Sequence, residues 1–493
     1  MSLKSFGAKI FAGVVVRKMK KWMDHPVQTQ QAVFLSLLKS AEGTQFGQDH
    51  HFSEIKTHAE FVARVPIRDY EQLRFYVDQM VAGKEDVLWP GKPLYFAKTS
   101  GTTSGAKYIP LTKESMPTHI KAARNAILCY IHETGKADFV DGKMIFLQGS
   151  PEMTEKNGIG LGRLSGIVAH YVPGYLQKNR MPSLETNCIE DWETKVDAIV
   201  EETKGEDMTV ISGIPSWVQM YFERLQTATD KKVGDLFKNF NLFIYGGVNY
   251  EPYRAKFEAL IGRKVDSIEL FPASEGFFAF QDSQQEKGLL LQLDSGMFYE
   301  FVKTEDFFSE TPQRLTIGEV EIGVNYVLLI STNAGLWCYN IGDTVMFTSV
   351  KPYRLVVSGR IKHFISAFGE HVIGKEVEQA MKEAMDAFSF SISEFTVAPQ
   401  VAVNDELPYH EWLIEFEEAP KDMQAVTDFI DQSMQTQNSY YFDLIKGKVL
   451  QPLKIASLER GAFQKYMKSQ GKLGGQNKVP RLSNDRKIAD QMV

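Results

Sequence analysis

Hydroxyl, glycine and lysine residues are concentrated in one short segment, KTSGTTSGAK at residues 98–107. This segment follows the apolar run PLYFA at 93–97, which is typical of a buried strand. Backbone N–H and side-chain O–H groups of such a loop can converge on phosphate oxygens, and its lysines can offset their charge. The segment is not a Walker A motif, because no serine or threonine follows Lys107. We expect a phosphate-binding loop; the alternative is a solvated Gly/Ser turn.

A second segment, residues 244–280, has the pattern of a strand, a Gly-Gly turn, an amphipathic helix, a second strand and then the sequence ASEG. Ligands of open α/β sheets bind at the carboxyl ends of strands, so Gly246, Gly247 and Glu275 could face one crevice. The Glu275 carboxylate could supply an oxygen ligand to Mg²⁺. A single loop glutamate is more often an exposed surface charge, and that alternative stays open.

A third segment combines WCYNIGDTVMF at 337–347 with SGRIKHF at 358–364. We expect a Gly turn between strands to fix Asp343, whose carboxylate could accept hydrogen bonds from two vicinal hydroxyls, as acidic residues do with ribose. Arg360 lies at a predicted domain boundary. The alternatives are an ordinary turn aspartate and an ordinary surface arginine.

The C-terminal segment at 460–481 carries six basic residues and no acidic one. A solvated basic tail is one interpretation. The other is that Lys478, which follows a Gly-Gly pair, swings onto a nucleotide phosphate. The residue pattern alone favours neither interpretation.

Helical periodicity in the first 80 residues, as in HPVQTQQAVFLSLLKSAEGT, predicts a helical scaffold ahead of these motifs. From residue 92, short apolar runs alternate with helical stretches at 113–133 and 215–229, which predicts an α/β architecture with buried strands. Between about 289 and 350 the helical signal fades and successive strands are predicted, among them EVEIG. We therefore expect a β-rich subdomain there.

After residue 358 the pattern resets to a helix at 373–387, two strands and a helix at 420–437. This pattern predicts a separate α+β domain. We predict an N-terminal domain at 1–358, with its β-rich subdomain at about 289–350, and a C-terminal domain at 359–493.

The chain has 493 residues, 43% of them hydrophobic and 12% aromatic, which is enough for large packed cores. Its net charge of −7 gives no field for holding a polyanion, so we expect no nucleic acid partner. Cys129, Cys188 and Cys338 fit neither a disulfide framework nor a metal site, and a reducing cytoplasm suits them best. No apolar run is long enough for a membrane span, so we expect no membrane partner, and IFAGVVV at 10–16 fits an amphipathic helix.

The order of the motifs resembles that of the acyl-adenylate-forming superfamily. More closely, the chain resembles the auxin-responsive Gretchen Hagen 3 family of acyl acid amido synthetases, from about residue 92 to 481, and we expect a non-plant member. The resemblance rests on FAKTSGTTSGAKYIPLT, LFPASEGFFAF, CYNIGDTVMF, GRIKHFISAFGEHV and SLERGAFQKYMKSQGKLGGQNKVPR. It implies an α/β fold with a large adenylate-forming N-terminal domain and a smaller, mobile α+β C-terminal domain.

The resemblance also implies roles for individual residues. Ser274 and Glu275 would contact the α-phosphate and Mg²⁺, Asp343 the ribose, and Phe271 would stack on the adenine. His363 stands where an acidic hinge residue is usual, which puts the hinge position in doubt. The phosphates of the nucleotide would be contacted by the loop residues Thr99, Ser100, Gly101, Thr102 and Thr103, with Lys107, Gly246, Gly247 and Arg360 also at the nucleotide site and Lys478 catalytic.

The implied reaction uses ATP and Mg²⁺ to convert a carboxylic acid into an acyl-adenylate and then transfers the acyl group to an amine, in the family an amino acid. The alternatives are an acyl-CoA ligase, which shares the first half-reaction, and a non-catalytic nucleotide-binding protein. The tail sequence QNKVPR lacks the ending common in ligases. The sequence selects neither the acid, nor the amine, nor the oligomeric state.

Overall fold

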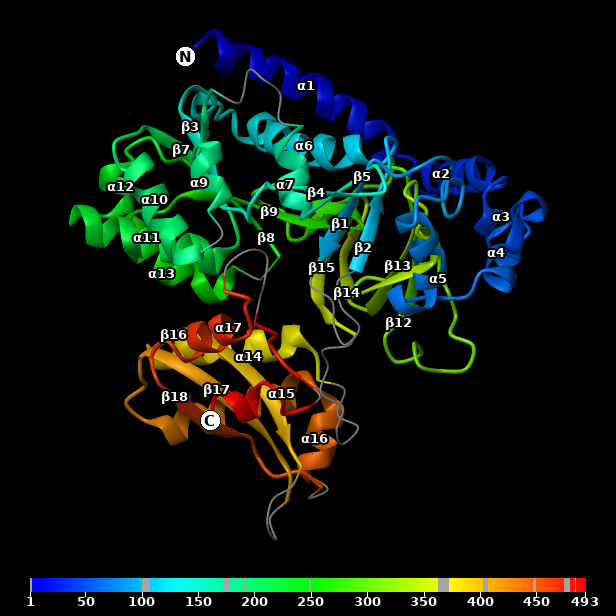
Figure 1. Ribbon diagram of the computed structural model, residues 1–493. Coiled ribbons are helices and arrows are strands. Elements are labelled where there is room, and N and C mark those ends of the chain that lie inside the picture. Colours follow the sequence, from blue (N-terminus) through cyan, green and yellow to red (C-terminus); the bar gives the residue numbers. More distant parts are fainter. Residues whose placement is uncertain are drawn as a thin grey trace. The chain divides into compact units, whose positions relative to one another are not determined.

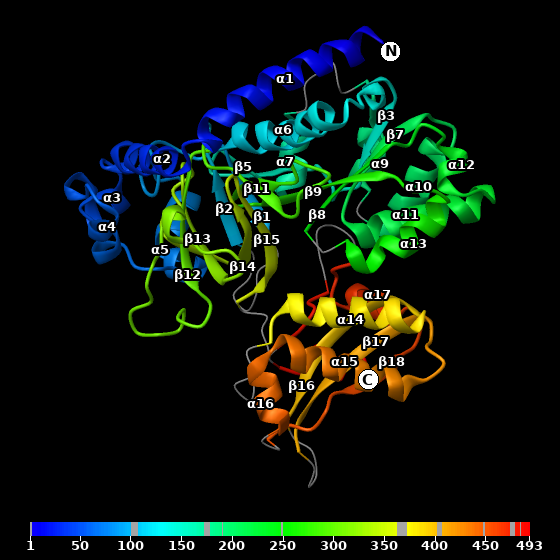
Figure 2. The same cartoon turned by 180° about the vertical axis from the view of Figure 1, so that it is seen from behind.

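The structure is a computed structural model of the chain (Figures 1 and 2). It describes residues 2–99, 107–171, 178–189, 191–247, 250–361, 372–401, 407–446, 449–473, 479–483 and 485–493. The chain divides into two compact units, which are treated separately below. Unit 1 consists of Met1–Asn249, Ala255–Ile341 and Val345–Val356, and unit 2 of Tyr250–Arg254, Gly342–Thr344 and Val357–Val493.

Helices form the first part of unit 1, as the periodicity predicted. They begin at residues that suit helix starts: Ser2 caps the first helix, and Thr57 and Asp69 each form a capping box. Pro26 occupies the first turn of the second helix, where a missing N–H costs nothing. The helices are α1 (Leu3–Met23), α2 (Pro26–Ala41), α3 (Gln45–Asp49), α4 (His58–Arg64) and α5 (Tyr70–Val81), with a 3₁₀ turn at Phe52–Glu54.

Among the described residues, eleven strands form a single sheet, in the order β12-β13-β14-β15-β11-β10-β9-β8-β7-β3-β6. The strands from β6 through β9 run parallel, and the β9–β10 hairpin reverses the direction. They are β3 (Lys143–Phe146), β6 (Arg180–Met181), β7 (Met208–Ser212), β8 (Leu242–Gly246), β9 (Asp266–Ala273), β10 (Gly276–Phe280), β11 (Leu289–Leu291), β12 (Met297–Lys303), β13 (Asn325–Thr332), β14 (Tyr339–Val350) and β15 (Tyr353–Arg360).

The strands predicted as a β-rich subdomain are therefore continuous with the α/β strands. The β9–β10 hairpin explains this arrangement, because β10 offers an antiparallel edge on which β11 and then β15 pair. One predicted strand is wrong: EVEIG at 319–323 contributes only a 3₁₀ turn, Ile317–Glu319, and an isolated bridge between Ile322 and Phe347. The Glu319 side chain accepts the Thr316 N–H in a capping box, which commits this stretch to a turn.

Helices cover the sheet of unit 1 (Figures 1 and 2). Helix α6 packs against β9 and β10, and α1 packs on α6 in turn. The helices are α6 (Met116–Thr134), α7 (Leu164–Ala169), α9 (Leu184–Cys188), α10 (Trp192–Thr203), α11 (Pro215–Thr229), α12 (Val233–Leu236) and α13 (Glu251–Ile261). A second, four-stranded sheet has the order β2-β1-β5-β4, formed by β1 (Tyr95–Thr99), β2 (Lys107–Leu111), β4 (Thr154–Lys156) and β5 (Ile159–Gly162).

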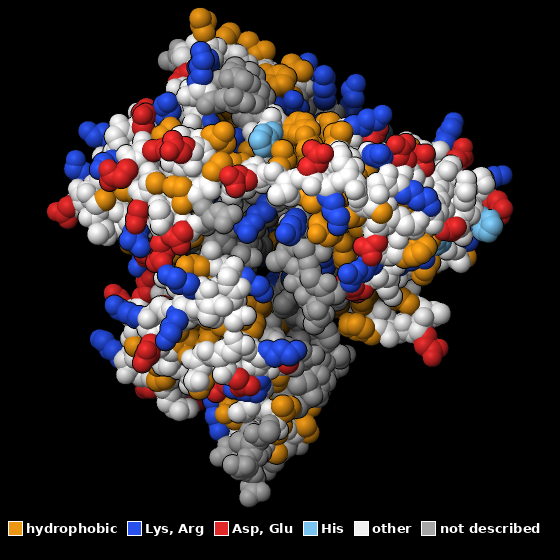
Figure 3. All heavy atoms as spheres, viewed as in Figure 1, with side chains coloured by type: hydrophobic (Ala, Val, Ile, Leu, Met, Phe, Trp, Pro, Cys, Tyr) orange, Lys and Arg blue, Asp and Glu red, His pale blue; other side chains and the backbone are white. Residues whose placement is uncertain are grey.

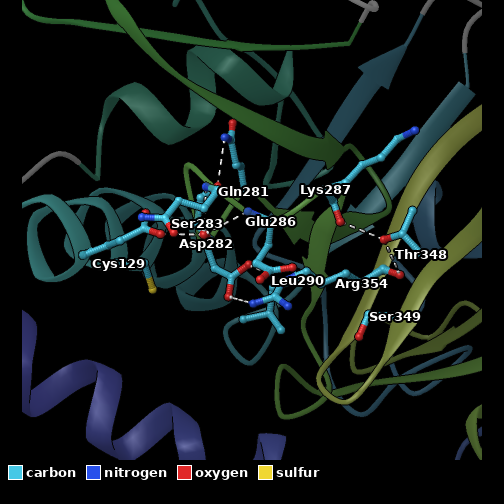
Figure 4. A network of polar contacts seen from close by, with 12 residues as sticks. Cys129, Gln281, Asp282, Ser283, Glu286, Lys287, Leu290, Thr348, Ser349 and Arg354 are labelled. Carbon is cyan, nitrogen blue, oxygen red and sulfur yellow. Dashed lines mark hydrogen bonds and ion pairs between the residues drawn. The ribbon is translucent and has the colours of Figure 1, made fainter.

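A polar network ties the β10–β11 connection to the β14–β15 hairpin (Figure 4). The Arg354 guanidinium on β15 makes a bidentate pair with Asp282, at 2.9 Å for each N–O distance. The Thr348 hydroxyl on β14 donates to the Lys287 carbonyl at 2.8 Å. Both partners in the pair are largely buried, and the pair raises the pKa of Arg354. The network therefore joins these two connections within the antiparallel part of the sheet.

Unit 2 has its own sheet and core. Strands β16 (Ser391–Gln400) and β17 (Tyr409–Glu418) are antiparallel, and β18 (Lys454–Leu458) joins β17 in parallel. Phe395 and Trp412 stack at 5.8 Å inside a core of buried apolar residues. The predicted helices at 373–387 and 420–437 are α14 (Gly374–Phe388) and α15 (Met423–Gln437), and α16 (Ser439–Lys446) and α17 (Ala462–Ser469) complete the unit.

No helix in the described residues is long and apolar enough to cross a membrane.

Candidate nucleotide site

Strand β8 ends in the two glycines that the sequence analysis selected, and each has a backbone reason to be glycine. A Cβ on Gly246 would lie 2.6 Å from the Leu270 carbonyl oxygen, because β8 and β9 are paired at this point. Gly247 has a φ of +87°, which side chains rarely adopt. The pair thus ends the strand at the carboxyl edge of the parallel strands, where ligands of α/β sheets bind.

Ser274 and Glu275 form the two-residue turn between β9 and β10, since Ala273 pairs directly with Gly276. Ser274 is buried, and Glu275 is partly exposed. Gly246 on β8 pairs with Leu270 on the parallel strand β9. The Ser274–Glu275 turn follows Leu270 by only a few residues, so it lies close to the two glycines at the same edge of the sheet. The structure therefore brings the Gly246–Gly247 turn and the Ser274–Glu275 turn to one edge of the sheet.

Phe271, predicted to stack on an adenine, lies on β9 with 7% of its surface exposed. Its ring packs edge to face against Phe278 on β10, with centroids 5.0 Å apart and planes at 64°. The ring is therefore held in place by the sheet, and little of it is exposed. Its role toward a base stays a prediction.

Asp343 does not lie in a turn between strands, which corrects the sequence analysis. It lies within the long strand β14, directly after Gly342, whose φ of +87° distorts the strand locally. The Arg360 Nε, at the end of β15, donates to the Asp343 Oδ1 at 2.7 Å, and the Ile361 N–H donates to the Gly342 carbonyl at 2.7 Å. Asp343 is 15% exposed and Arg360 is 56% exposed. The two residues, predicted from separate motifs, form one ion pair at the point where β14 and β15 adjoin.

We expect Asp343→Asn to weaken ATP binding by about 1.5 to 3 kcal/mol, the range for hydrogen bonds to a charged group. The amide keeps the shape of the carboxylate but cannot accept hydrogen bonds from a diol at both oxygens. Titration calorimetry of ATP measures this loss, and Arg360→Gln is the matched variant that removes the ion pair while keeping the carboxylate. If Arg360→Gln alone lowers the affinity and Asp343→Asn does not, Asp343 has no part in binding.

The predicted phosphate loop is bounded by two antiparallel strands, since Thr99 at the end of β1 pairs with Lys107 at the start of β2. The Lys107 Nζ lies 5.6 Å from the centre of the Tyr70 ring. Ser100, Gly101, Thr102 and Thr103 lie outside the described residues, as do the side chain of Thr99 and the residues His363 and Lys478. Their predicted roles therefore stay predictions.

Within the described ranges, no three His, Cys, Asp or Glu side chains are grouped so that they could hold a metal ion. Mg²⁺ at nucleotide sites is commonly held by one or two carboxylates together with substrate phosphates. A single partly exposed glutamate at a strand-end turn, Glu275, fits that donor set. The described residues do not provide a Mg²⁺ site made of protein ligands alone.

One polar cluster near this edge was not selected from the sequence. Gln148 follows β3. In the orientation that satisfies both neighbours, its amide nitrogen donates to the Ser165 carbonyl at 3.1 Å and its amide oxygen accepts from the Arg180 Nη2 at 2.7 Å. Burial lowers the pKa of Arg180, and among the described residues its Nε and the Ser165 Oγ, both buried, have no hydrogen-bond partner. The pairing of β3 with β6 brings these residues together, so no local motif could have shown the cluster.

Three family models match the chain in order: the GH3 family N-terminal domain at residues 15–183, the central domain at 290–360 and the C-terminal domain at 375–487. The chain belongs to the GH3 family. The resemblance found in its motifs is thereby confirmed.

Among proteins of known name, the jasmonoyl–L-amino acid synthetase JAR4 of Nicotiana attenuata is 19% identical over 382 residues. That alignment covers 64% of this chain and 66% of the relative, just under two thirds of its length.

Among solved structures, the GH3.15 acyl acid amido synthetase matches with a TM-score of 0.79 at 14% identity, over 97% of this chain and 95% of that one. A 2-hydroxyisobutyryl-CoA ligase in the postadenylation state matches with a TM-score of 0.60 at 13% identity, over 93% and 89%. The fold is thus that of the acyl-adenylate-forming enzymes, with a large N-terminal and a smaller C-terminal domain, as the resemblance implied.

Proposed function

We propose that this GH3 family member is an ATP-dependent acyl acid amido synthetase. The observation that carries the proposal is the ordered match to all three GH3 domains. Two further observations support it: two turns with the expected glycine and Ser-Glu residues share one sheet edge, and the fold is that of relatives named as amido synthetases.

The reaction proceeds in two steps. In the first, a carboxylate oxygen of the acid bonds to the α-phosphorus of ATP, the bond to the β-phosphate bridge breaks, and pyrophosphate leaves. In the second, an amino acid's amine bonds to the acyl carbon, AMP leaves with the former carboxylate oxygen, and the amine loses a proton. Neither step needs a nucleophilic side chain, so the residues chiefly bind, orient and neutralise charge.

We assign binding roles to residues at the strand ends and to Asp343 within β14. Ser274 and Glu275 would face the α-phosphate, with Glu275 as a ligand of Mg²⁺, which when bound would neutralise phosphate charge. Asp343 would accept hydrogen bonds from the ribose, in competition with its ion pair to Arg360. The loop at 98–107 would hold the outer phosphates, and residues 359–493 would act as the mobile lid domain.

The three cysteines support a proposal for the cellular compartment. Cys129, Cys188 and Cys338 are all free thiols, and burial raises the pKa of Cys129 to about 12. Unpaired thiols suit a reducing compartment, and we propose the cytoplasm.

The alternative is an acyl-CoA ligase, favoured by the structural match to the 2-hydroxyisobutyryl-CoA ligase. Measuring pyrophosphate release over a panel of carboxylic acids, with each amino acid or with CoA, separates the two. Acid-dependent release together with formation of an acyl–amino acid product supports the proposal. Formation of an acyl-CoA thioester instead establishes the alternative, and no release with any acid contradicts both.

Lys478 is the proposed catalytic cation of the first step. Just after it, the Val397 N–H on β16 donates to the Arg481 carbonyl at 2.9 Å, and the Thr396 hydroxyl donates to the Pro480 carbonyl at 2.7 Å. Arg481 is itself fixed by ion pairs with Glu378 and Glu394. The chain immediately after Lys478 is therefore anchored to the sheet of unit 2, unlike a loosely solvated tail.

We expect Lys478→Ala to slow adenylation by about 10²-fold or more, as loss of a charge-stabilising donor does. Transfer from preformed acyl-AMP should stay nearly normal, because pyrophosphate has already left. Single-turnover measurements of each half-reaction test this, with Lys472→Ala as a control in the same basic tail. Lys472→Ala should leave both steps near the wild-type rate. Equal slowing of both steps by Lys478→Ala, or slowing of neither, would show that Lys478 does not have this role.

A further inference from the structure

Helix α1 has a buried face that fixes it on unit 1. Ser5, Ala12, Val15, Met19 and Trp22 are buried on this face, which packs on α6. The Ser5 hydroxyl donates to the Asp138 carboxylate at 3.0 Å, and the sulfur atoms of Met19 and Cys129 are 3.9 Å apart. The helix is therefore an integral part of the unit and presents its other face outward.

The outward face of α1 is apolar over its first half. Large apolar side chains recur there at helical spacing, with exposed fractions of 90% for Leu3, 55% for Phe6, 57% for Ile10 and 42% for Val14. Phe11 flanks them, with its ring 5.6 Å from the Arg124 guanidinium on α6. Single exposed apolar residues are common, whereas an aligned group of four usually marks an interaction surface. We call Leu3, Phe6, Ile10 and Val14 the apolar stripe of α1.

The same helix is also basic, and four of its six basic side chains, Arg17, Lys18, Lys20 and Lys21, lie in its second half. The helix contains no acidic residue, although the chain as a whole carries a net charge of −7. Among the described residues, no ion pair neutralises any of its six basic side chains, which are Lys4, Lys9, Arg17, Lys18, Lys20 and Lys21. In Figure 3 hydrophobic side chains follow the top of the molecule along α1, and Lys and Arg side chains lie beside its later turns. The face thus combines apolar insertion with positive charge.

We propose that α1 docks unit 1 on the surface of an anionic lipid bilayer, lying in the plane of the headgroups. The apolar stripe would enter the boundary between headgroups and acyl chains, and the basic turns would bind anionic headgroups. The buried face keeps its contacts with α6, so docking requires no unfolding. This docking differs from spanning, for which no described helix is suited.

The charge distribution argues against a second copy of the chain as the occupant. A symmetric pairing along the full helix would place six uncompensated positive charges against another six, or would set the basic turns of one copy on the apolar stripe of the other. Both arrangements are unfavourable. An anionic surface complements both halves of the face.

Sedimentation of the full chain with phosphatidylcholine vesicles, with and without phosphatidylserine, tests the proposal. Wild type should bind the anionic vesicles, bind the neutral ones at least about tenfold less, and dissociate at high salt. The double variant Phe6→Ser/Ile10→Ser and the double variant Lys18→Gln/Lys21→Gln should each lose about tenfold or more in binding. Phe75→Ser, which removes a 66% exposed aromatic residue from α5, should bind like wild type.

Circular dichroism shows whether each variant is folded, and sedimentation velocity without vesicles reports self-association. Absence of binding to anionic vesicles by folded wild type overturns the proposal, as does equal binding by the Phe6→Ser/Ile10→Ser variant. A wild-type dimer that this variant converts to a monomer also overturns it, because the apolar stripe would then be an interface between copies.

Discussion

Glu275→Gln should lower the rate of pyrophosphate release by about 10²- to 10³-fold, as loss of one charge-stabilising group in a phosphoryl-transfer site does. The amide fits the same two-residue turn, so β9 and β10 stay paired and the fold is kept. It removes the negative charge with which a carboxylate binds Mg²⁺ at a nucleotide site. Steady-state release at several Mg²⁺ concentrations measures the effect, and higher Mg²⁺ should partly restore the rate.

Glu286→Gln is the matched control, because Glu286 is an exposed carboxylate on the β10–β11 connection of the same sheet. It should release pyrophosphate at the wild-type rate. A normal rate in Glu275→Gln, with a normal circular dichroism spectrum, would remove Glu275 from the metal site and leave it as a turn residue.

Arg314→Met should destabilise unit 1 by about 3 to 5 kcal/mol, because it leaves a buried carboxylate without its cation. Glu300 on β12 is fully buried, and the Arg314 Nε and Nη2 donate to its two oxygens at 2.8 and 2.9 Å. The His58 Nε2, at the start of α4, lies 2.7 Å from the Glu300 Oε1. The Arg314 Nη1 also donates to the Val65 carbonyl at 2.6 Å, so this cluster attaches the N-terminal helices to the sheet.

The pH dependence of the stability loss in Arg314→Met follows from the protonation of Glu300. Burial alone would raise its pKa, but the Arg314 charge and the hydrogen bonds from His58 and Arg314 outweigh burial and hold the pKa below its ordinary value. A depressed carboxyl pKa stabilises the folded state above the unfolded value of about 4.3, and the stabilisation is lost as the pH falls through the folded value. In Arg314→Met burial dominates and raises the Glu300 pKa, so the deficit against wild type should shrink toward acidic pH.

Urea unfolding at neutral and mildly acidic pH measures both effects. Arg74→Met is the control, because its pair with Glu71 is about half exposed and worth at most about 1 kcal/mol. The double variant Glu300→Leu/Arg314→Met should recover much of the lost stability, since it leaves no buried charge unpaired. A single variant as stable as wild type would show that the cluster contributes nothing to folding.

The sequence predicted the elements with strong periodicity. Helix α11 begins and ends where the pattern placed it, and α14 begins and ends within one residue of its predicted bounds. Strands β4, β5 and β6 went unpredicted, because they are short and their residues alternate little. The joining of the β-rich strands to the α/β strands depends on β10 as a pairing edge, and pairing between distant strands leaves no local signal.

The candidate site was predictable where backbone geometry demands a residue type. Glycine is needed at both positions of the Gly246–Gly247 turn, so the sequence shows that turn directly. Asp343 was placed in a turn because glycine precedes it, yet the strand continues through both residues. Its pairing with Arg360 and the Gln148–Arg180 cluster arise from strand neighbours, which sequence spacing does not specify.

The close approach at the end of β8 bears on how this protein could be altered by selection or design. Any side chain at Gly246 would overlap the Leu270 carbonyl, and any at Gly247 would be strained by its backbone conformation. Every single-nucleotide change that replaces either glycine is therefore disfavoured by the backbone alone, whatever its effect on ligand binding. Libraries that seek new acid or amine preferences gain nothing by randomising this turn, and the positions open to variation are those beyond it.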